Sequence, residues 1–150
     1  MKSWNLIWKK QTNFSQLEEI TADIYCHLKN KAPFCLWLEG ALGAGKTTFT
    51  KQLFYTMGLA SSTSVNSPTY TYLLEYQIKN KWYGHLDFYR ADTTSKPEMQ
   101  SLLGLKEYHG FVIEWPKKIS ADESIEPTHL LQITEADNFD SRVYSFYEKS

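Results

Sequence analysis

Two stretches of the chain repeat apolar residues at the three- and four-residue spacing that is typical of one buried helix face. The first predicts a helix that starts with a capping box formed by Ser15 and Glu18 and ends near Asn30. The second predicts a helix over residues 48–57 that ends at Gly58. The apolar positions are Leu17, Ile20, Ile24, Leu28, Phe49, Leu53 and Met57.

Shorter apolar runs bounded by turn residues predict strands. Residues 34–38 and 111–113 are typical of buried strands, and residues 4–8 of an edge strand. Two hairpins are expected, one from residues 69–78 and 82–89 about a turn at Asn80 and Lys81, the other from 130–134 and 142–147. Short helical segments are predicted over 98–103 and 105–109. Hairpins pair antiparallel, so the chain predicts one α/β domain over residues 1–150 with a mixed parallel and antiparallel sheet.

A glycine-rich segment, Gly40 to Thr48, lies between the first buried strand and the second helix and fits G-x-x-x-x-G-K-[ST]. Backbone N–H groups in such a P-loop face one phosphate, and the helix N-terminus adds positive potential. We expect Lys46 to reach the β- and γ-phosphates of ATP, or solvent when no nucleotide is bound, and Thr47 to bind Mg²⁺. The predicted fold is therefore a P-loop NTPase-like, three-layer fold. The predicted nucleotide-binding residues are Leu42, Gly43, Ala44, Gly45, Lys46, Thr47 and Thr48.

A P-loop needs a carboxylate at the end of a neighbouring strand to hold Mg²⁺ or its waters. Glu114 directly follows the apolar run 111–113 and is the stronger candidate. Asp87 follows residues 84–86 and is the weaker one. Both are kept as site residues.

The segment 60–68 is rich in Ser and Thr and has no apolar period, which indicates a loop. At this place in a nucleotide-binding domain such a loop serves either as a nucleotide switch or as a plain connector, and composition favours neither.

Charge and composition narrow the function. The net charge of −1 gives no electrostatic basis for binding nucleic acid unaided. Arg90 and Arg142 are the two arginines of the sequence, too few for the lid of a small-molecule kinase. Cys26 and Cys35 form no C-x-x-C pair, and the histidines lack metal-ligand spacing. With no signal peptide or long apolar run, we expect a cytoplasmic protein that does not bind membranes.

Five blocks together closely resemble the TsaE (YjeE) family of bacterial P-loop ATPases. They follow the family's order and spacing over about residues 12 to 116, whereas the C-terminal third carries little signature. The blocks are L-G-A-G-K-T-T-F at 42–49, S-P-T-Y at 67–70, H-L-D-F-Y-R at 85–90, L-G-L at 103–105 and I-E-W-P at 113–116.

The resemblance implies a part in making threonylcarbamoyladenosine, the modified nucleoside beside the tRNA anticodon. It implies the TsaD and TsaB proteins as partners, with ATP hydrolysis needed for multiple rounds of modification. By the same resemblance, Thr47 and Glu114 ligate Mg²⁺, Asp87 lies by the γ-phosphate or its attacking water, and Trp115 backs the pocket. Adenine is expected near residues 12–15. The implied switch loop is Ser67, Pro68, Thr69 and Tyr70.

Two residues depart from the family pattern. Ala41 stands where the family commonly has an acid, and Ser101 where it usually has a glutamate. Two other functions stay open: a nucleotide-gated protein-binding module whose hydrolysis is incidental, and a small-molecule kinase, which the arginine count disfavours.

Overall fold

The computed structural model describes residues 3–68, 71–91, 103, 106–119 and 125–150 of the 150-residue chain. Thr69 and Tyr70 of the predicted switch loop lie outside the described residues, as does Ser101. The same holds for the helical segment predicted over 98–103, apart from Leu103.

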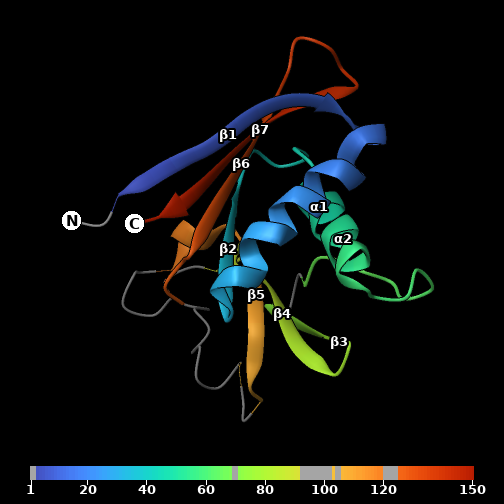
Figure 1. Ribbon diagram of the computed structural model, residues 1–150, viewed down its shortest axis with the longest axis vertical. Helices are drawn as coiled ribbons and strands as arrows, with labels where there is room; N and C mark the ends of the chain where they lie inside the picture. The colour runs from blue at the N-terminus through green and yellow to red at the C-terminus, as the bar shows by residue number, and fades with distance from the viewer. Residues whose placement is uncertain (1–2, 69–70, 92–102, 104–105, 120–124) are drawn as a thin grey trace.

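Seven strands form one sheet in the order β1-β7-β6-β2-β5-β4-β3 (Figure 1). The four central strands, β6, β2, β5 and β4, run parallel, and β7, β1 and β3 pair antiparallel at the two sides. The predicted mixed sheet and both predicted hairpins are confirmed. The strands are β1 Trp4–Asn13, β2 Phe34–Glu39, β3 Leu73–Ile78, β4 Lys81–Asp87, β5 Tyr108–Glu114, β6 His129–Glu135 and β7 Ser141–Lys149.

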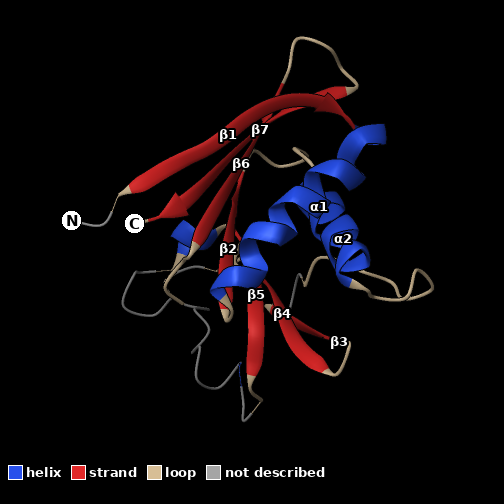
Figure 2. Ribbon diagram, in the orientation of Figure 1, coloured by secondary structure: helices blue, strands red, loops and turns tan. Residues whose placement is uncertain are grey.

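Both described α-helices, α1 Leu17–Leu28 and α2 Lys46–Met57, cover the same face of the sheet (Figure 2). Each buries the apolar stripe that the sequence predicts, and the two are joined by a 2.8 Å contact between the Thr21 and Thr56 hydroxyl oxygens. Short 3₁₀ turns at Phe14–Gln16, Lys29–Lys31 and Pro116–Lys118 flank the helices and strands. Burial of these stripes, rather than intrinsic propensity, holds such short helices in place.

The opposite face of the sheet carries a second apolar cluster, in which Cys35, Phe111 and Ile113 pack against Phe88 and Ile119. Phe88 and Ile119 belong to the segments that follow β4 and β5. Within the part of the chain that the structure describes, the third layer therefore consists of these connecting segments together with Leu103, a helical residue that packs against the same cluster.

The structure corrects the predicted start of the first helix. The capping box is formed by Asn13 and Gln16, whose side chain accepts from the Asn13 N–H at 3.4 Å, and not by Ser15 and Glu18. The Ser15 hydroxyl donates instead to the Asn13 side chain. The N-terminal strand also continues to Asn13, so this residue both ends β1 and caps the helical segment.

The first hairpin is shorter than predicted at its open end, and its turn is shifted by one residue. Tyr72 has a left-handed backbone (φ 63°) that cannot continue a strand, so β3 begins at Leu73. The turn residues are Lys79 and Asn80, both at positive φ as a two-residue type I′ turn requires, instead of Asn80 and Lys81. β4 stops at Asp87, because its carboxylate accepts the Tyr89 N–H at 2.9 Å and turns the chain.

The helical segment predicted over 105–109 is wrong where the structure describes it, since Tyr108 and His109 open β5. The Tyr108 hydroxyl donates to Glu75 of β3 and is 3.1 Å from the Leu103 carbonyl oxygen. These contacts outweigh the weak local helix signal. No helix in the described residues is long and apolar enough to cross a membrane.

Candidate nucleotide site

The segment between β2 and α2 forms a P-loop at the carboxyl end of the sheet's central strands. Gly45 takes a left-handed conformation (φ 110°) directly before α2, a backbone that strongly favours glycine. Gly40 is confined by space, because a Cβ there would lie 2.7 Å from the Ile133 carbonyl oxygen. Gly40 therefore lets the loop begin close against β6, and Gly45 lets it turn into α2.

Lys46 is the residue whose placement differs most from expectation. Its side chain is only 5% exposed, and Nζ donates to the carbonyl oxygens of Gly40 (2.6 Å) and Ala41 (3.0 Å). Nζ also lies 4.2 Å from the centre of the Trp115 ring. Burial lowers the pKa of Lys46, while the charges of Glu114 and Asp87 act in the opposite direction. The expectation that this lysine extends into solvent is therefore wrong.

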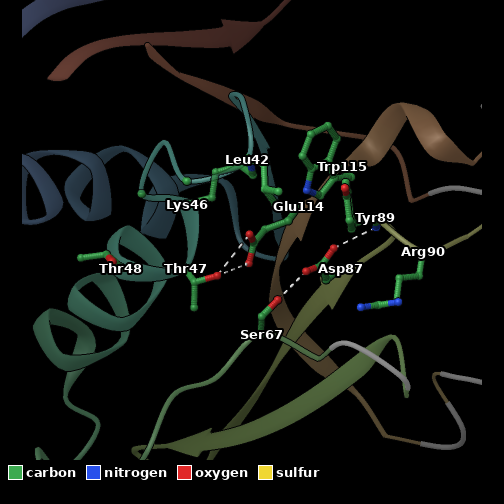
Figure 3. Close-up of a pocket in the computed structure, with 12 residues that line it drawn as sticks. Leu42, Lys46, Thr47, Thr48, Ser67, Asp87, Tyr89, Arg90, Glu114 and Trp115 are labelled. Carbon is green, nitrogen blue, oxygen red and sulfur yellow. Dashed lines mark hydrogen bonds between the residues drawn. The ribbon is translucent and has the colours of Figure 1, made fainter. Parts of the chain in front are cut away.

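Thr47 and Glu114 come together as predicted (Figure 3). The Thr47 hydroxyl lies 3.3 and 3.2 Å from the two carboxylate oxygens of Glu114, at the end of β5. Glu114 is almost fully buried, and its Oε2 lies 2.6 Å from Nε2 of His85 on β4. A hydroxyl and a carboxylate oxygen at this spacing are two ligands of the kind that Mg²⁺ binds beside phosphate and water.

Asp87 lies across the cavity from the P-loop, at the end of β4 (Figure 3). One carboxylate oxygen accepts the Ser67 hydroxyl and the other accepts the Tyr89 N–H. Asp87 is therefore held by the loop after α2 and by its own strand end. These contacts fix its side chain without making it a partner of Thr47, whose hydroxyl bonds to Glu114.

Trp115 follows Glu114 and reverses the chain with a left-handed backbone (φ 57°), which is strained for a bulky residue. Its ring contacts Lys46 on one side of the site and lies 4.9 Å from the Tyr89 ring between centroids. The predicted role of Trp115 as the wall of the pocket agrees with this position. Strained non-glycine residues of this kind are concentrated at functional sites.

These residues enclose a cavity of about 490 Å³ (Figure 3). Of the predicted nucleotide-binding residues, Ala44 does not line it, because its side chain is buried in the core beneath the loop. Pro68 does not line it either. The lining residues are Leu42, Gly43, Gly45, Lys46, Thr47, Thr48, Ser67, Asp87, Tyr89, Arg90, Glu114 and Trp115.

Three residues at or near the cavity were not assigned a role from the sequence. Tyr89 and Arg90 line it, and both stand in the block 85–90 that carries the family resemblance. His85 is buried behind it against Glu114. A polar residue two positions before Asp87 on the same strand points to the same face of the sheet as Asp87, so strand periodicity was the available signal for His85.

The start of the helical region lies beside the P-loop, where adenine was expected. The Phe14 ring is 3.7 Å from the place of a Cβ on Gly45 and 5.2 Å from the Arg142 guanidinium carbon. Arg142 also donates from Nε to the Ala44 carbonyl oxygen at 3.2 Å. Phe14 is 43% exposed, so part of its side chain is accessible to a planar ligand.

The charges around the cavity suit a nucleotide and one divalent cation. Lys46 and the α2 N-terminus would supply positive potential for phosphates, and Thr47 with Glu114 would supply oxygen ligands. In the described part of the chain no three His, Cys, Asp or Glu side chains gather as a metal cluster. A cation here would therefore have to complete its coordination with phosphate oxygens and water, which is usual for Mg²⁺.

A family model described as "Threonylcarbamoyl adenosine biosynthesis protein TsaE" matches residues 11–143 of the chain. Among curated proteins, the tRNA threonylcarbamoyladenosine biosynthesis protein TsaE of Haemophilus influenzae is 36% identical over 101 residues. The match covers 65% of this chain and 61% of that protein. The protein of the same name from Bacillus subtilis is 43% identical over 102 residues, covering 65% of this chain and 58% of the relative. The chain thus spans about three fifths of the length of these relatives.

Among solved structures, the crystal structure of Bacillus subtilis YdiB is similar with a TM-score of 0.70 and 24% sequence identity. The superposition covers 97% of this chain and 87% of that one. This likeness, together with the sheet order, confirms the predicted α/β fold class.

Proposed function

Because the chain belongs to the TsaE family of threonylcarbamoyladenosine biosynthesis proteins, we propose that it is a Mg²⁺-dependent ATPase that assists this modification of tRNA. The observation that carries the proposal is the meeting of Thr47 and Glu114 beside the P-loop lysine. A hydroxyl at the start of a P-loop helix and a carboxylate at the end of a neighbouring strand are what a Mg·ATP site requires.

Phosphate binding would be the work of the loop amides and Lys46. Nζ of Lys46 now donates to two carbonyl oxygens, and a charged phosphate oxygen is a stronger acceptor than either. We therefore infer that the ammonium turns from Gly40 and Ala41 to the phosphates when ATP binds. The Trp115 ring can stay in contact with the lysine stem during this change, which limits the movement to the end of the side chain.

The metal would be held by Thr47 and Glu114, and it would neutralise charge on the β- and γ-phosphate oxygens. Asp87 is suited to a different task, because it lies on the next strand and is already oriented by Ser67 and Tyr89. In our proposal it accepts a proton or a hydrogen bond from the attacking water. Its near-burial, at 8% exposure, keeps bulk water from competing for the carboxylate.

Adenine is placed by this proposal against Phe14, with Arg142 fixing the ring from its other side. The distance from Phe14 to Gly45 is short enough for a base to follow the phosphates out of the loop. The exposed Leu42 would form the opposite apolar rim.

The partners in this proposal are TsaD and TsaB, and hydrolysis would reset them between rounds of modification. Transfer of the threonylcarbamoyl group would take place on TsaD. Ser67, which bonds to Asp87, links the loop after α2 directly to the hydrolytic site and gives a route by which nucleotide state changes that loop.

The decisive experiment reconstitutes modification of tRNA from purified proteins and counts nucleosides formed per TsaD–TsaB complex. Wild-type protein with Mg·ATP is expected to support many rounds, and Glu114→Gln only about one. If Glu114→Gln loses ATP hydrolysis and still supports many rounds, the protein is a nucleotide-gated binding module. If ADP release occurs only with a small-molecule acceptor, it is a kinase.

A further inference from the structure

His85 occupies a buried position directly behind the nucleotide cavity. It lies in the middle of β4, between Leu74 of β3 and Val112 of β5, and its side chain is fully buried. The residue does not line the cavity. Any influence of His85 on bound ligands must therefore pass through a residue that does line it.

That residue is Glu114, whose Oε2 lies 2.6 Å from Nε2 of His85. A carboxylate that ligates a cation, as the proposed function requires of Glu114, only accepts hydrogen bonds, so Nε2 is the donor of this pair in that function. The other ring nitrogen, Nδ1, has no hydrogen-bond partner within the described residues. The Phe54 ring meets the imidazole edge-on, at 6.4 Å between centroids and 84° between planes, which restricts rotation of the ring.

The same carboxylate faces Thr47, which lies 3.2 Å from Oε2 and 3.3 Å from Oε1. Thr47 is nearly equidistant from the two oxygens and does not fix the rotation of the carboxylate by itself. The shorter bond from His85 distinguishes the oxygens, because it engages Oε2 alone. Oε1 is then the oxygen left for a cation beside the Thr47 hydroxyl.

We propose that His85 is a positioning residue for the divalent cation, acting by a hydrogen bond that holds Glu114 Oε2 and presents Oε1 toward Thr47. The proposal rests on the Mg²⁺ role of Thr47 and Glu114 given above. Hydrogen bonds to a metal-ligating side chain orient it, and their loss typically lowers metal affinity about 10- to 100-fold. His85 would raise cation affinity in this way without touching the cation or the nucleotide.

Three substitutions of His85 and one control at another buried histidine test this role. His85→Leu introduces an apolar side chain of similar size and removes the donor. His85→Gln can place an amide donor near the position of Nε2, whereas His85→Asn places it near Nδ1. His129 on β6 is a matched control, since it is also fully buried but lies against Thr128 and Glu148, away from the cavity.

The first measurement is calorimetric ADP affinity with Mg²⁺ and with a chelator. For His85→Leu we expect unchanged affinity in the chelator and a Mg²⁺ requirement about 10- to 100-fold higher than wild type. His85→Gln should be close to wild type and His85→Asn close to His85→Leu. His129→Gln should match wild type. The same order is expected for Mn²⁺ binding followed by electron paramagnetic resonance, which does not depend on turnover.

A structural role for His85 predicts a different result. If the residue only stabilises the core, thermal unfolding changes but the Mg²⁺ requirement of the folded protein does not, which would overturn the proposal. A double-mutant cycle combines His85→Leu with Glu114→Gln. In the Glu114→Gln background, His85→Leu should no longer raise the Mg²⁺ requirement. Should His85→Leu fail to fold, equal Mg²⁺ requirements for His85→Gln and His85→Asn would equally overturn it.

Failure of the proposed function gives yet another result. In that case wild-type protein itself shows no Mg²⁺-dependent nucleotide affinity, and the variants cannot differ from it in this respect. A normal Mg²⁺ response in wild type together with an unchanged response in His85→Leu rejects only the role of His85.

Discussion

The Lys46 ammonium lies 4.2 Å from the centre of the Trp115 ring, and it donates to two carbonyl oxygens of its own loop. The strained backbone of Trp115 directs this ring toward the P-loop. Lysine, tryptophan and loop thus form one contact set, which a nucleotide bound as proposed would rearrange. Such binding would include the loss of two charge-assisted hydrogen bonds as well as the gain of phosphate contacts.

Lys46→Ala should lower ATP affinity about 10- to 100-fold, because a hydrogen bond to a charged group contributes roughly 1.5–3 kcal/mol. The fold should persist with at most a small loss of stability, since the carbonyl oxygens of Gly40 and Ala41 lose one donor only. Calorimetry checks the affinity and thermal unfolding the fold. Lys51→Ala, an exposed lysine one turn further along α2, is the matched control. Equal ATP affinity for both variants would contradict the role of Lys46.

Glu114→Gln should abolish Mg²⁺-dependent phosphate release and keep most of the nucleotide affinity, because Lys46 and the loop amides are unchanged. The amide is a neutral and weaker ligand for a hard cation. Phosphate release and calorimetric binding are measured on the same preparation, with the exposed Glu135→Gln as control. Hydrolysis equal to wild type would reassign the essential carboxylate to Asp87.

The sequence predicted those parts of the site that depend on local order. Strand, glycine loop and helix follow one another along the chain, so spacing alone places Thr47 and the loop amides together. Glu114 could also be predicted, since an acid after a buried parallel strand comes to the same edge of the sheet as the P-loop. Asp87 was predicted from its strand in the same way, as the weaker candidate, and the family resemblance added Trp115.

What the sequence did not predict depends on contacts between distant segments. Lys46 is buried because Trp115, 69 positions later, turns back over it with a left-handed backbone. His85 meets Glu114 because β4 and β5 pair in one particular register, with His85 opposite Val112. The capping box moved to Asn13 because a strand of ten residues, held by β7, ends there. None of these follows from propensity or periodicity.

Stability should fall on mild acidification because of His129. Burial lowers the pKa of His129 to about 4 from an ordinary 6.5, with Glu148 opposing and His27 and Lys31 assisting the shift. The unfolded chain then binds more protons than the folded one between these two values, so stability rises with pH across that window. Above pH 6.5 the free energy of unfolding is not reduced by His129, and roughly 2 kcal/mol of it is lost by pH 5.

Urea unfolding at pH 7.5 and pH 5 measures this loss. His129→Gln should reduce the difference between the two free energies of unfolding, because no buried imidazole remains to be charged. His27→Gln should leave most of the difference between the two free energies of unfolding, since that side chain is part-exposed. A wild-type difference fully retained in His129→Gln would assign the acid sensitivity to other groups.

The loop after α2 should change its protection with the nucleotide's γ-phosphate. Ser67 donates to Asp87, so a ligand group that interacts with the Asp87 carboxylate also affects this loop. We expect residues 62–70 to exchange amide hydrogens faster with ADP than with a non-hydrolysable ATP analogue. Ser67→Ala should weaken the contrast, and Ser61→Ala, in the same loop but away from the cavity lining, should not. Equal exchange rates with both nucleotides in the wild-type protein would show that the loop is a plain connector and not a nucleotide switch.

The last prediction concerns the partner proteins. A net charge of −1 and two arginines provide little phosphate neutralisation, so tRNA alone should neither bind tightly nor change ATP turnover. Suppose that TsaD–TsaB binds the ATP-bound loop and the ADP-bound loop with different affinities. The nucleotide then changes the affinity of this protein for TsaD–TsaB, and TsaD–TsaB must change its affinity for the nucleotide by the same factor, typically about 5- to 150-fold. Titration with TsaD–TsaB, followed by phosphate release and nucleotide affinity, should show this change, and Ser67→Ala should reduce it. Titration with bare tRNA is the parallel measurement. Tight tRNA binding, or no response to the two proteins, would contradict a function exerted through protein partners.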